Sequence, residues 1–303
     1  MNLRFYISFS ISVFLIFNGE LYSQIDTSYS LNQKGRRSIV FASQGVLVFG
    51  SLAYLSSTWY SGFEDSDFHT FDDSGQWLQM DKIGHIAAAD IVSNINYKAY
   101  RWAGYSNKQA TWMGAGITWG YLAVVEVMDG SSAAWGFSWS DIAANTLGTG
   151  LFIAQQLAWE DQRMIIKFSY HPTEYADMRP EVLGSTPSQR ILKDYNGQTY
   201  WFSVNPQSFS REKKIFPYWL NLSLGYSADG MLGGQSNIGE DYDFSHIERV
   251  RQFYFSPDVD FTRIKTRSKF LKTLFVVLNI IKVPAPTIEI DQNGNVQFYW
   301  FYF

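Results

Sequence analysis

The sequence predicts an α+β protein in which a helical half comes first and a sheet follows. Long apolar segments with few charged residues, rich in Gly, Ala, Ser and Thr, fill the first half of the chain. After Gln162 the pattern changes to alternating apolar and polar residues, which is typical of strands. Near the end, Asn293-Gly294 is a strong hairpin signal. We therefore expect an N-terminal apolar four-helix bundle over residues 24–162. A C-terminal antiparallel sheet or incomplete β-barrel, with an amphipathic helix, is expected over residues 163–303.

The N-terminus has the composition of a targeting segment. Arg4 supplies a positive start, residues 5–17 form an apolar stretch, and Ser23 stands at the expected cleavage point. An uncleaved membrane anchor is the alternative, although the apolar stretch is short for a span. We expect residues 1–23 to be a signal peptide and the mature protein to be exported.

Four segments of the first half have the length and composition of helices. Their frequent small residues would let the helix backbones approach closely. Tryptophans stand at the ends of these segments, as they do where helices meet a membrane interface. A soluble bundle with tryptophans at its rim is the alternative. The expected helices cover residues 38–63, 81–102, 109–125 and 142–159.

The second half is expected to form strands, with one helix over residues 268–282. The aromatic-rich closing strand, which ends at Phe303, is similar to the C-terminal signal of outer-membrane barrels. A complete barrel usually has at least about eight strands, which is more than this segment offers, so an open sheet fits equally well. An ordinary terminal hairpin is a further alternative. The expected strands cover residues 164–171, 198–204, 218–227, 250–261, 287–291 and 296–303.

Composition excludes several classes of function. The formal net charge of −4, from 24 Lys and Arg against 28 Asp and Glu, gives no basic footprint for nucleic acid. The sequence has no cysteine, which excludes disulfides, thiolate nucleophiles and a lipid-anchoring cysteine. An aromatic share of 18% is high, and aromatic side chains favour strands and wet–dry boundaries. We expect an envelope protein of the outer membrane or periplasm, whose partner is the membrane or an envelope lipid or glycan.

A first polar cluster opens the second expected helix. Asp81 and His85 lie one helical turn apart, and Lys82 is three residues from His85. Asp81 could be a helix cap, and a lone His85 could be a satisfied core histidine. Buried ionisable groups are costly unless they are paired, so their presence here also points to a functional site.

Two further clusters lie on the third and fourth expected helices. Glu126 and Asp129 share a face at a helix C-terminus, where carboxylates oppose the helix dipole and need a cation, a metal or a proton. Asp141, Asn145 and Gly148 form one stripe of the next helix, in which Asp141 could also be a cap. If the helix faces meet, one polar site forms inside the bundle. Its candidate members are Asp81, Lys82, His85, Glu126, Asp141 and Asn145.

The order of these residues resembles that of a known family. The pattern is Asp81-Lys82-x-x-His85, then Glu126, then Asp141-x-x-x-Asn145-x-x-Gly148. It resembles the YfiM-like family, domain of unknown function 2279, over about residues 35–160, and is similar, more distantly, to VanZ-like envelope proteins. The downstream strands resemble the larger version of the family found in Bacteroidota. Family members are often described as periplasmic lipoproteins, from which this cysteine-free chain departs. The resemblance implies a location and a site, but no reaction.

Three functions stay open at this point. The polar cluster could be a buried network that fixes helix register in a structural envelope protein. Alternatively, His85 could act as a general base or metal ligand in a membrane-embedded hydrolase or transferase acting on an envelope lipid or glycan. A single imidazole with carboxylates could hold a divalent cation, but a zinc site usually has more histidine or cysteine ligands than this cluster offers. The cofactor is therefore left open. Thirdly, the aromatic strands, with Tyr200 and Phe253 among them, could stack on a glycan.

Overall fold

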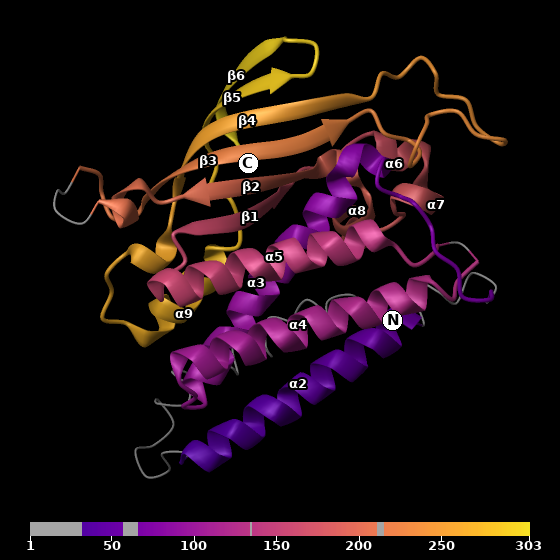
Figure 1. Ribbon diagram of the computed structural model, residues 1–303. Helices are drawn as coiled ribbons and strands as arrows, with labels where there is room; N and C mark the ends of the chain where they lie inside the picture. The colour runs from indigo at the N-terminus through magenta and orange to yellow at the C-terminus, as the bar shows by residue number, and fades with distance from the viewer. Residues whose placement is uncertain (1–31, 57–65, 134, 211–214) are drawn as a thin grey trace. The chain divides into compact units, whose positions relative to one another are not determined.

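The computed structural model describes residues 32–56, 66–133, 135–210 and 215–303 (Figure 1). The predicted signal peptide, residues 1–23, lies outside the described residues. The chain divides into two compact units. The helical unit comprises the residues up to Asp73 together with Ala88–Gln162, and the sheet unit comprises Ser74–Ala87 and Arg163–Phe303. The architecture is α+β, as predicted, and the six-stranded sheet is open.

The helical unit contains long helices that begin at polar caps. The Ser106 side chain accepts a hydrogen bond from the backbone N–H of Gln109, and the Gln109 side chain accepts one from the backbone N–H of Ser106. Together these two bonds form a capping box at the start of α4 (Asn107–Asp129). Ser138 caps the last helix of the unit by accepting from the Asp141 backbone. By length and composition alone, one helix of the described chain, Gln33–Leu55, could cross a membrane. The helices are α2 (Gln33–Leu55), α3 (Met80–Trp102, of which the part after Ala87 belongs here), α4 (Asn107–Asp129) and α5 (Trp139–Trp159).

Polar side chains join the helices on the inside of this unit. The Tyr100 hydroxyl on α3 donates to Gln44 Oε1 on α2, and Gln44 Nε2 donates to Asn96 Oδ1 at 3.2 Å. Asn96 Nδ2 donates in turn to Thr118 Oγ1 on α4 at 3.0 Å. Large apolar side chains of the same helices are exposed instead. They include Phe41, Phe49, Trp112, Val127, Trp139 and Leu147.

Replacing Glu160 by Gly is expected to stabilise the helical unit by about 1 kcal/mol. Glu160 follows α5 with a φ of 51°, in the left-handed region, where a Cβ atom costs about 1–2 kcal/mol and Gly is favoured. Chemical unfolding measures the change. Glu160→Ala is the matched control, because it removes the same carboxylate but keeps the Cβ, and it should have almost no effect. Equal effects of the two variants would assign the change to the carboxylate and contradict the backbone argument.

The sheet unit is a single antiparallel sheet in which every strand pairs with its neighbours in sequence, in the order β1-β2-β3-β4-β5-β6 (Figure 1). The outer edge of β1 pairs with the chain just before β5, since Phe168 N donates to Ile280 O and Lys282 N donates to Phe168 O. The strands are β1 (Met164–Tyr170), β2 (Gln198–Val204), β3 (Leu220–Asp229), β4 (Val250–Val259), β5 (Ala285–Asp291) and β6 (Val296–Tyr302).

Short helices and turns connect the strands. α9 is the predicted amphipathic helix, although it is shorter than expected because Asn279 already caps its end. The other connecting helices each have seven residues or fewer, which is too short for a periodic pattern to reveal in the sequence. They are α6 (Tyr175–Met178), α7 (Pro180–Leu183), α8 (Pro187–Lys193), η4 (Tyr195–Gly197), η5 (Pro206–Phe209) and η6 (Phe261–Arg263), whereas α9 spans Lys269–Leu278.

A left-handed turn leads into α3 and belongs to the sheet unit. In η3 (Gln76–Gln79), the last three residues have φ between 48° and 65°, which side chains with a Cβ rarely adopt. The sheet holds this turn in place: the Tyr226 hydroxyl donates to Leu78 O, and Arg251 Nη2 donates to Gln79 Oε1 at 2.7 Å. A strained backbone conformation persists only where the surrounding structure holds it. Here the strained turn determines the residue at which α3 begins.

Candidate functional site

The first predicted cluster forms at the beginning of α3. Lys82 Nζ donates to Asp81 Oδ2 at 2.8 Å, and the Tyr195 hydroxyl of η4 donates to Asp81 Oδ1 at 2.8 Å. His85 Nε2 lies 3.8 Å from the same Oδ1. All of these groups except Tyr195 were predicted from the sequence. The Asp81 carboxylate therefore joins one turn of α3 to the chain that precedes β2.

The start of α3 packs closely against β2. A Cβ atom at Gly84 would lie 2.9 Å from the Tyr200 hydroxyl, so the helix can approach this tyrosine only with Gly at that position. Burial, and secondarily the nearby charge of Asp81, raises the pKa of Tyr200. Tyr200 therefore stays a neutral donor, and its hydroxyl donates to Gln198 Oε1 at 2.9 Å.

The remaining predicted residues belong to the helical unit. Glu126 on α4 and both Asp141 and Asn145 on α5 are buried. The alternative that Asp141 caps α5 is wrong, because the cap is Ser138, whose Oγ accepts from the Asp141 backbone N at 3.0 Å. The candidate residues thus fall into two sets, one in each unit. The convergence of both sets into one site stays a prediction.

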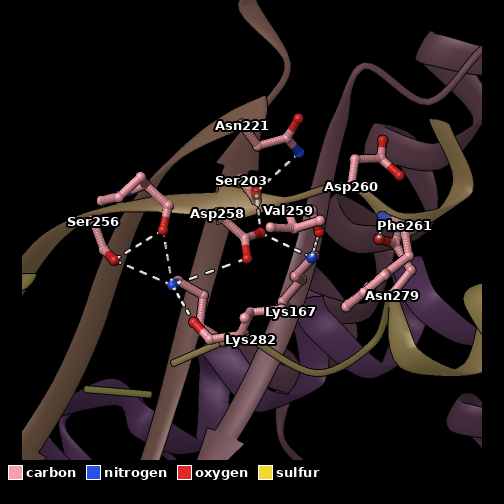
Figure 2. Close-up of polar contacts among 12 residues, drawn as sticks. Lys167, Ser203, Asn221, Ser256, Asp258, Val259, Asp260, Phe261, Asn279 and Lys282 are labelled. Carbon is pink, nitrogen blue, oxygen red and sulfur yellow. Dashed lines mark hydrogen bonds and ion pairs between the residues drawn. The ribbon is translucent and has the colours of Figure 1, made fainter. Parts of the chain in front are cut away.

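The sheet unit holds a second charged cluster, which sequence analysis missed (Figure 2). Asp258 on β4 is fully buried, and its Oδ2 lies 2.8 Å from Lys167 Nζ on β1, which is also fully buried. Ser203 Oγ donates to the same carboxylate oxygen at 2.7 Å, and Asn221 Nδ2 donates to Ser203 Oγ at 3.0 Å. Four strands therefore meet around one carboxylate.

Lys282, which follows α9, is the third charged member of this cluster. Its Nζ donates to Ser256 Oγ at 3.1 Å, to Pro257 O at 3.0 Å and to Val283 O at 2.8 Å, and lies 3.9 Å from Asp258 Oδ1 (Figure 2). Burial lowers the pKa of Lys282 to about 8, although the charge of Asp258 acts in the opposite direction. The cluster therefore places two buried lysine amino groups beside one buried carboxyl group.

Protein stability is expected to rise between about pH 8 and 10.5 because of Lys282. In this window the folded protein has lost the Lys282 proton, whereas the unfolded chain, with the ordinary pKa of 10.5, still holds it. The unfolded state then binds more protons, so the free energy of unfolding rises with pH, by at most about 1.4 kcal/mol per pH unit. Urea unfolding over this range, compared with Lys282→Met, measures the effect. An identical pH dependence in the variant would contradict it.

One face of the sheet is apolar and exposed. The strand register aligns one residue from each of the six strands into a continuous row, and all members of the row except Ile166 are exposed. A neighbouring row continues the surface with Phe253, Ile290 and Val296. The aligned row is Ile166, Phe202, Leu224, Phe255, Ile288 and Phe298.

The opposite face of the sheet is buried and largely polar, although the aromatic side chains of Trp201 and Tyr254 also lie on it. Ser203, Ser223 and Ser256 form one buried row across β2, β3 and β4, and the charged cluster around Asp258 lies on this face. Tyr302 of β6 reaches across the same face, with its hydroxyl 3.5 Å from Thr199 Oγ1 of β2. In this part of the sheet the exposed face is therefore more apolar than the buried one, whereas an antiparallel sheet with one buried face usually buries its apolar side chains.

The comparisons with known proteins agree with the resemblance seen in the sequence. Residues 67–155 match the model of a family described as "Predicted periplasmic lipoprotein (DUF2279)". The match takes in α3, α4 and most of α5, and so confirms over this segment the predicted resemblance to domain of unknown function 2279. This family description supports export of the chain to the cell envelope. Similarity to VanZ-like proteins stays a prediction. No curated protein and no solved structure matches the chain.

Proposed function

We propose that this chain is a structural protein of the outer membrane, which its sheet unit meets through the apolar face. The observation that carries the proposal is the row of apolar side chains across all six strands, opposite a buried polar face. Alternation of outward apolar and inward polar residues is the pattern of sheets that meet lipid. Lipid hydrocarbon is therefore the environment that fits the exposed face.

The helical unit supports the same proposal. Its buried hydrogen bonds between helices are made by Gln, Asn, Thr and Tyr side chains, beside a small apolar core, and several of its exposed positions carry Trp, Phe, Val and Leu. Large exposed apolar side chains favour an apolar environment, and polar groups between helices are a feature of bundles that contact lipid. An envelope protein with lipid on the outside of both units accounts for both patterns.

The Asp81 cluster fits a structural role in this proposal. Both carboxylate oxygens of Asp81 accept hydrogen bonds from the chain itself, one from Lys82 and one from Tyr195. Such a half-buried network fixes the start of α3 against the chain before β2, as polar networks do when they specify one arrangement. The role of the cluster would then be to hold the start of α3 in position, and not to catalyse a reaction.

Fractionation of the cell envelope tests the proposal. Full-length protein, expressed with its own N-terminus, should remain in the membrane fraction after washes with high salt and with alkaline carbonate, which release peripheral proteins. In a density gradient it should migrate with the outer membrane. Release of the protein by carbonate, or its recovery in the soluble periplasmic fraction, would contradict contact with the hydrocarbon layer.

A further inference from the structure

The connection between β4 and β5 concentrates positive charge in a protein that is otherwise acidic. Residues 261–284 contain six of the 24 Lys and Arg residues and none of the 28 Asp and Glu residues. Among them, Lys265, Arg267 and Lys272 are exposed, and we call these three residues the basic rim. Since the whole chain carries a net charge of −4, this concentration is local.

The basic rim stands on an ordered support. The Phe261 and Phe275 rings stack with centroids 5.8 Å apart, and Phe261 N donates to Asn279 Oδ1 at 2.9 Å, which ties η6 to α9. Exposed apolar side chains lie beside the charges, because Phe270 at the start of α9 is 58% exposed and Leu271 is also exposed. The segment therefore presents cations and apolar groups together, which is the composition of a membrane-surface helix.

Exposed aromatic residues surround the same end of the sheet. The register places the end of β4 beside the start of β3 and the start of β5 beside the end of β6. Aromatic girdles mark the level at which a membrane-embedded sheet passes from hydrocarbon to headgroups. The exposed aromatic residues here are Tyr218, Trp219, Trp300, Phe301 and Phe303.

The other end of the strands has the opposite charge. The connection from β3 to β4, residues 230–249, exposes Glu240, Asp241, Asp243 and Glu248, against Arg249 as its one Lys or Arg. The two ends of the sheet therefore differ in sign. An anionic surface attracts only the end that carries the basic rim.

We propose that the basic rim binds the anionic phosphate headgroups of bilayer lipids, at the level where the apolar face of the sheet enters the hydrocarbon. The inference rests on the proposed membrane contact and adds to it a lipid class and an orientation. A basic residue near an anionic membrane surface contributes on the order of 1 kcal/mol of binding, and the adjacent Phe270 and Leu271 would enter the interface.

Vesicle flotation of the full-length protein tests this inference. Protein in detergent is diluted into vesicles of phosphatidylcholine alone, or of phosphatidylcholine with a quarter of phosphatidylglycerol. We expect stronger binding to the phosphatidylglycerol vesicles, and a loss of about tenfold or more of that preference in the double variant Arg267→Gln, Lys272→Gln. The control Lys34→Gln, Lys108→Gln removes two exposed basic residues of the helical unit and the same net charge, and it should retain the preference.

The other possible results of the flotation experiment contradict either the headgroup inference or the proposed function. Equal binding to both vesicle types, or loss in the control as great as in the Arg267→Gln, Lys272→Gln variant, overturns the headgroup inference but leaves hydrocarbon contact intact. Failure to float with either vesicle contradicts the proposed function itself. Inorganic phosphate at the concentration of the lipid phosphate should not displace the protein, and displacement would reassign the basic rim to free phosphate.

Discussion

Replacing Asp258 by Asn is expected to lower the free energy of unfolding by about 3–5 kcal/mol, which is enough to unfold many domains. The substitution keeps the shape of the side chain but removes the counter-charge from two buried lysines, Lys167 and Lys282. Both lysine side chains and Asp258 are fully buried, so water cannot compensate for the loss. Urea unfolding in detergent, or the yield of folded protein if the variant does not accumulate, measures the effect.

A second substitution distinguishes the loss of charge balance from a general defect of packing. Lys282→Met in the Asp258→Asn background removes one of the two buried amino groups that have lost their counter-charge, so it should recover part of the lost stability. Ser203→Ala, which removes only the hydroxyl that donates to Asp258, should cost about 1 kcal/mol. If the double variant is no more stable than Asp258→Asn alone, buried charge is not the cause.

The order and type of the long elements could be predicted from the sequence. Periodicity and small-residue content identified α3, α4 and α5, and alternation identified all six strands, because these signals lie within each segment. The boundaries differ by a few residues where a cap decides them. Ser106 and Asn279, for example, begin and end helices at positions that hydrophobic periodicity does not reveal.

The candidate site was harder to predict because its contacts are distant in sequence. Asp81, Lys82 and His85 share one helix turn and were found, whereas Tyr195, their partner, is 114 residues from Asp81 and has no local signal. The cluster around Asp258 was missed for the same reason. In the sequence, Lys167 is one polar position of an alternating strand, and only the structure reveals its contact with Asp258 on β4.

Alternation revealed the strands but not which face of the sheet is buried. The usual rule buries the apolar positions, yet this sheet buries Ser203, Ser223 and Ser256 and exposes Leu224 and Phe255. The sequence pattern is the same in both cases, since a period of two only separates two faces. Whether the apolar face is buried or exposed depends on the surroundings of the sheet, and the alternating pattern does not record these.

Replacing Leu224 by Arg is expected to cost about 2–4 kcal/mol of stability in the membrane, although Leu224 is 60% exposed. On a water-exposed surface the same substitution would change stability by about 0.5 kcal/mol or less. The large effect arises because the guanidinium would have to enter hydrocarbon in the middle of the apolar row. Unfolding in bilayers and retention of the protein after an alkaline carbonate wash measure it.

Leu192→Arg is the matched control for this prediction. Leu192 on α8 is also 60% exposed, but it lies outside the apolar face of the sheet, so the substitution should have little effect in the same bilayer. If both variants lose stability equally, charge and not location is responsible. If neither does, the face that Leu224 occupies meets water, and a soluble binding surface replaces lipid as the reason for its apolar side chains.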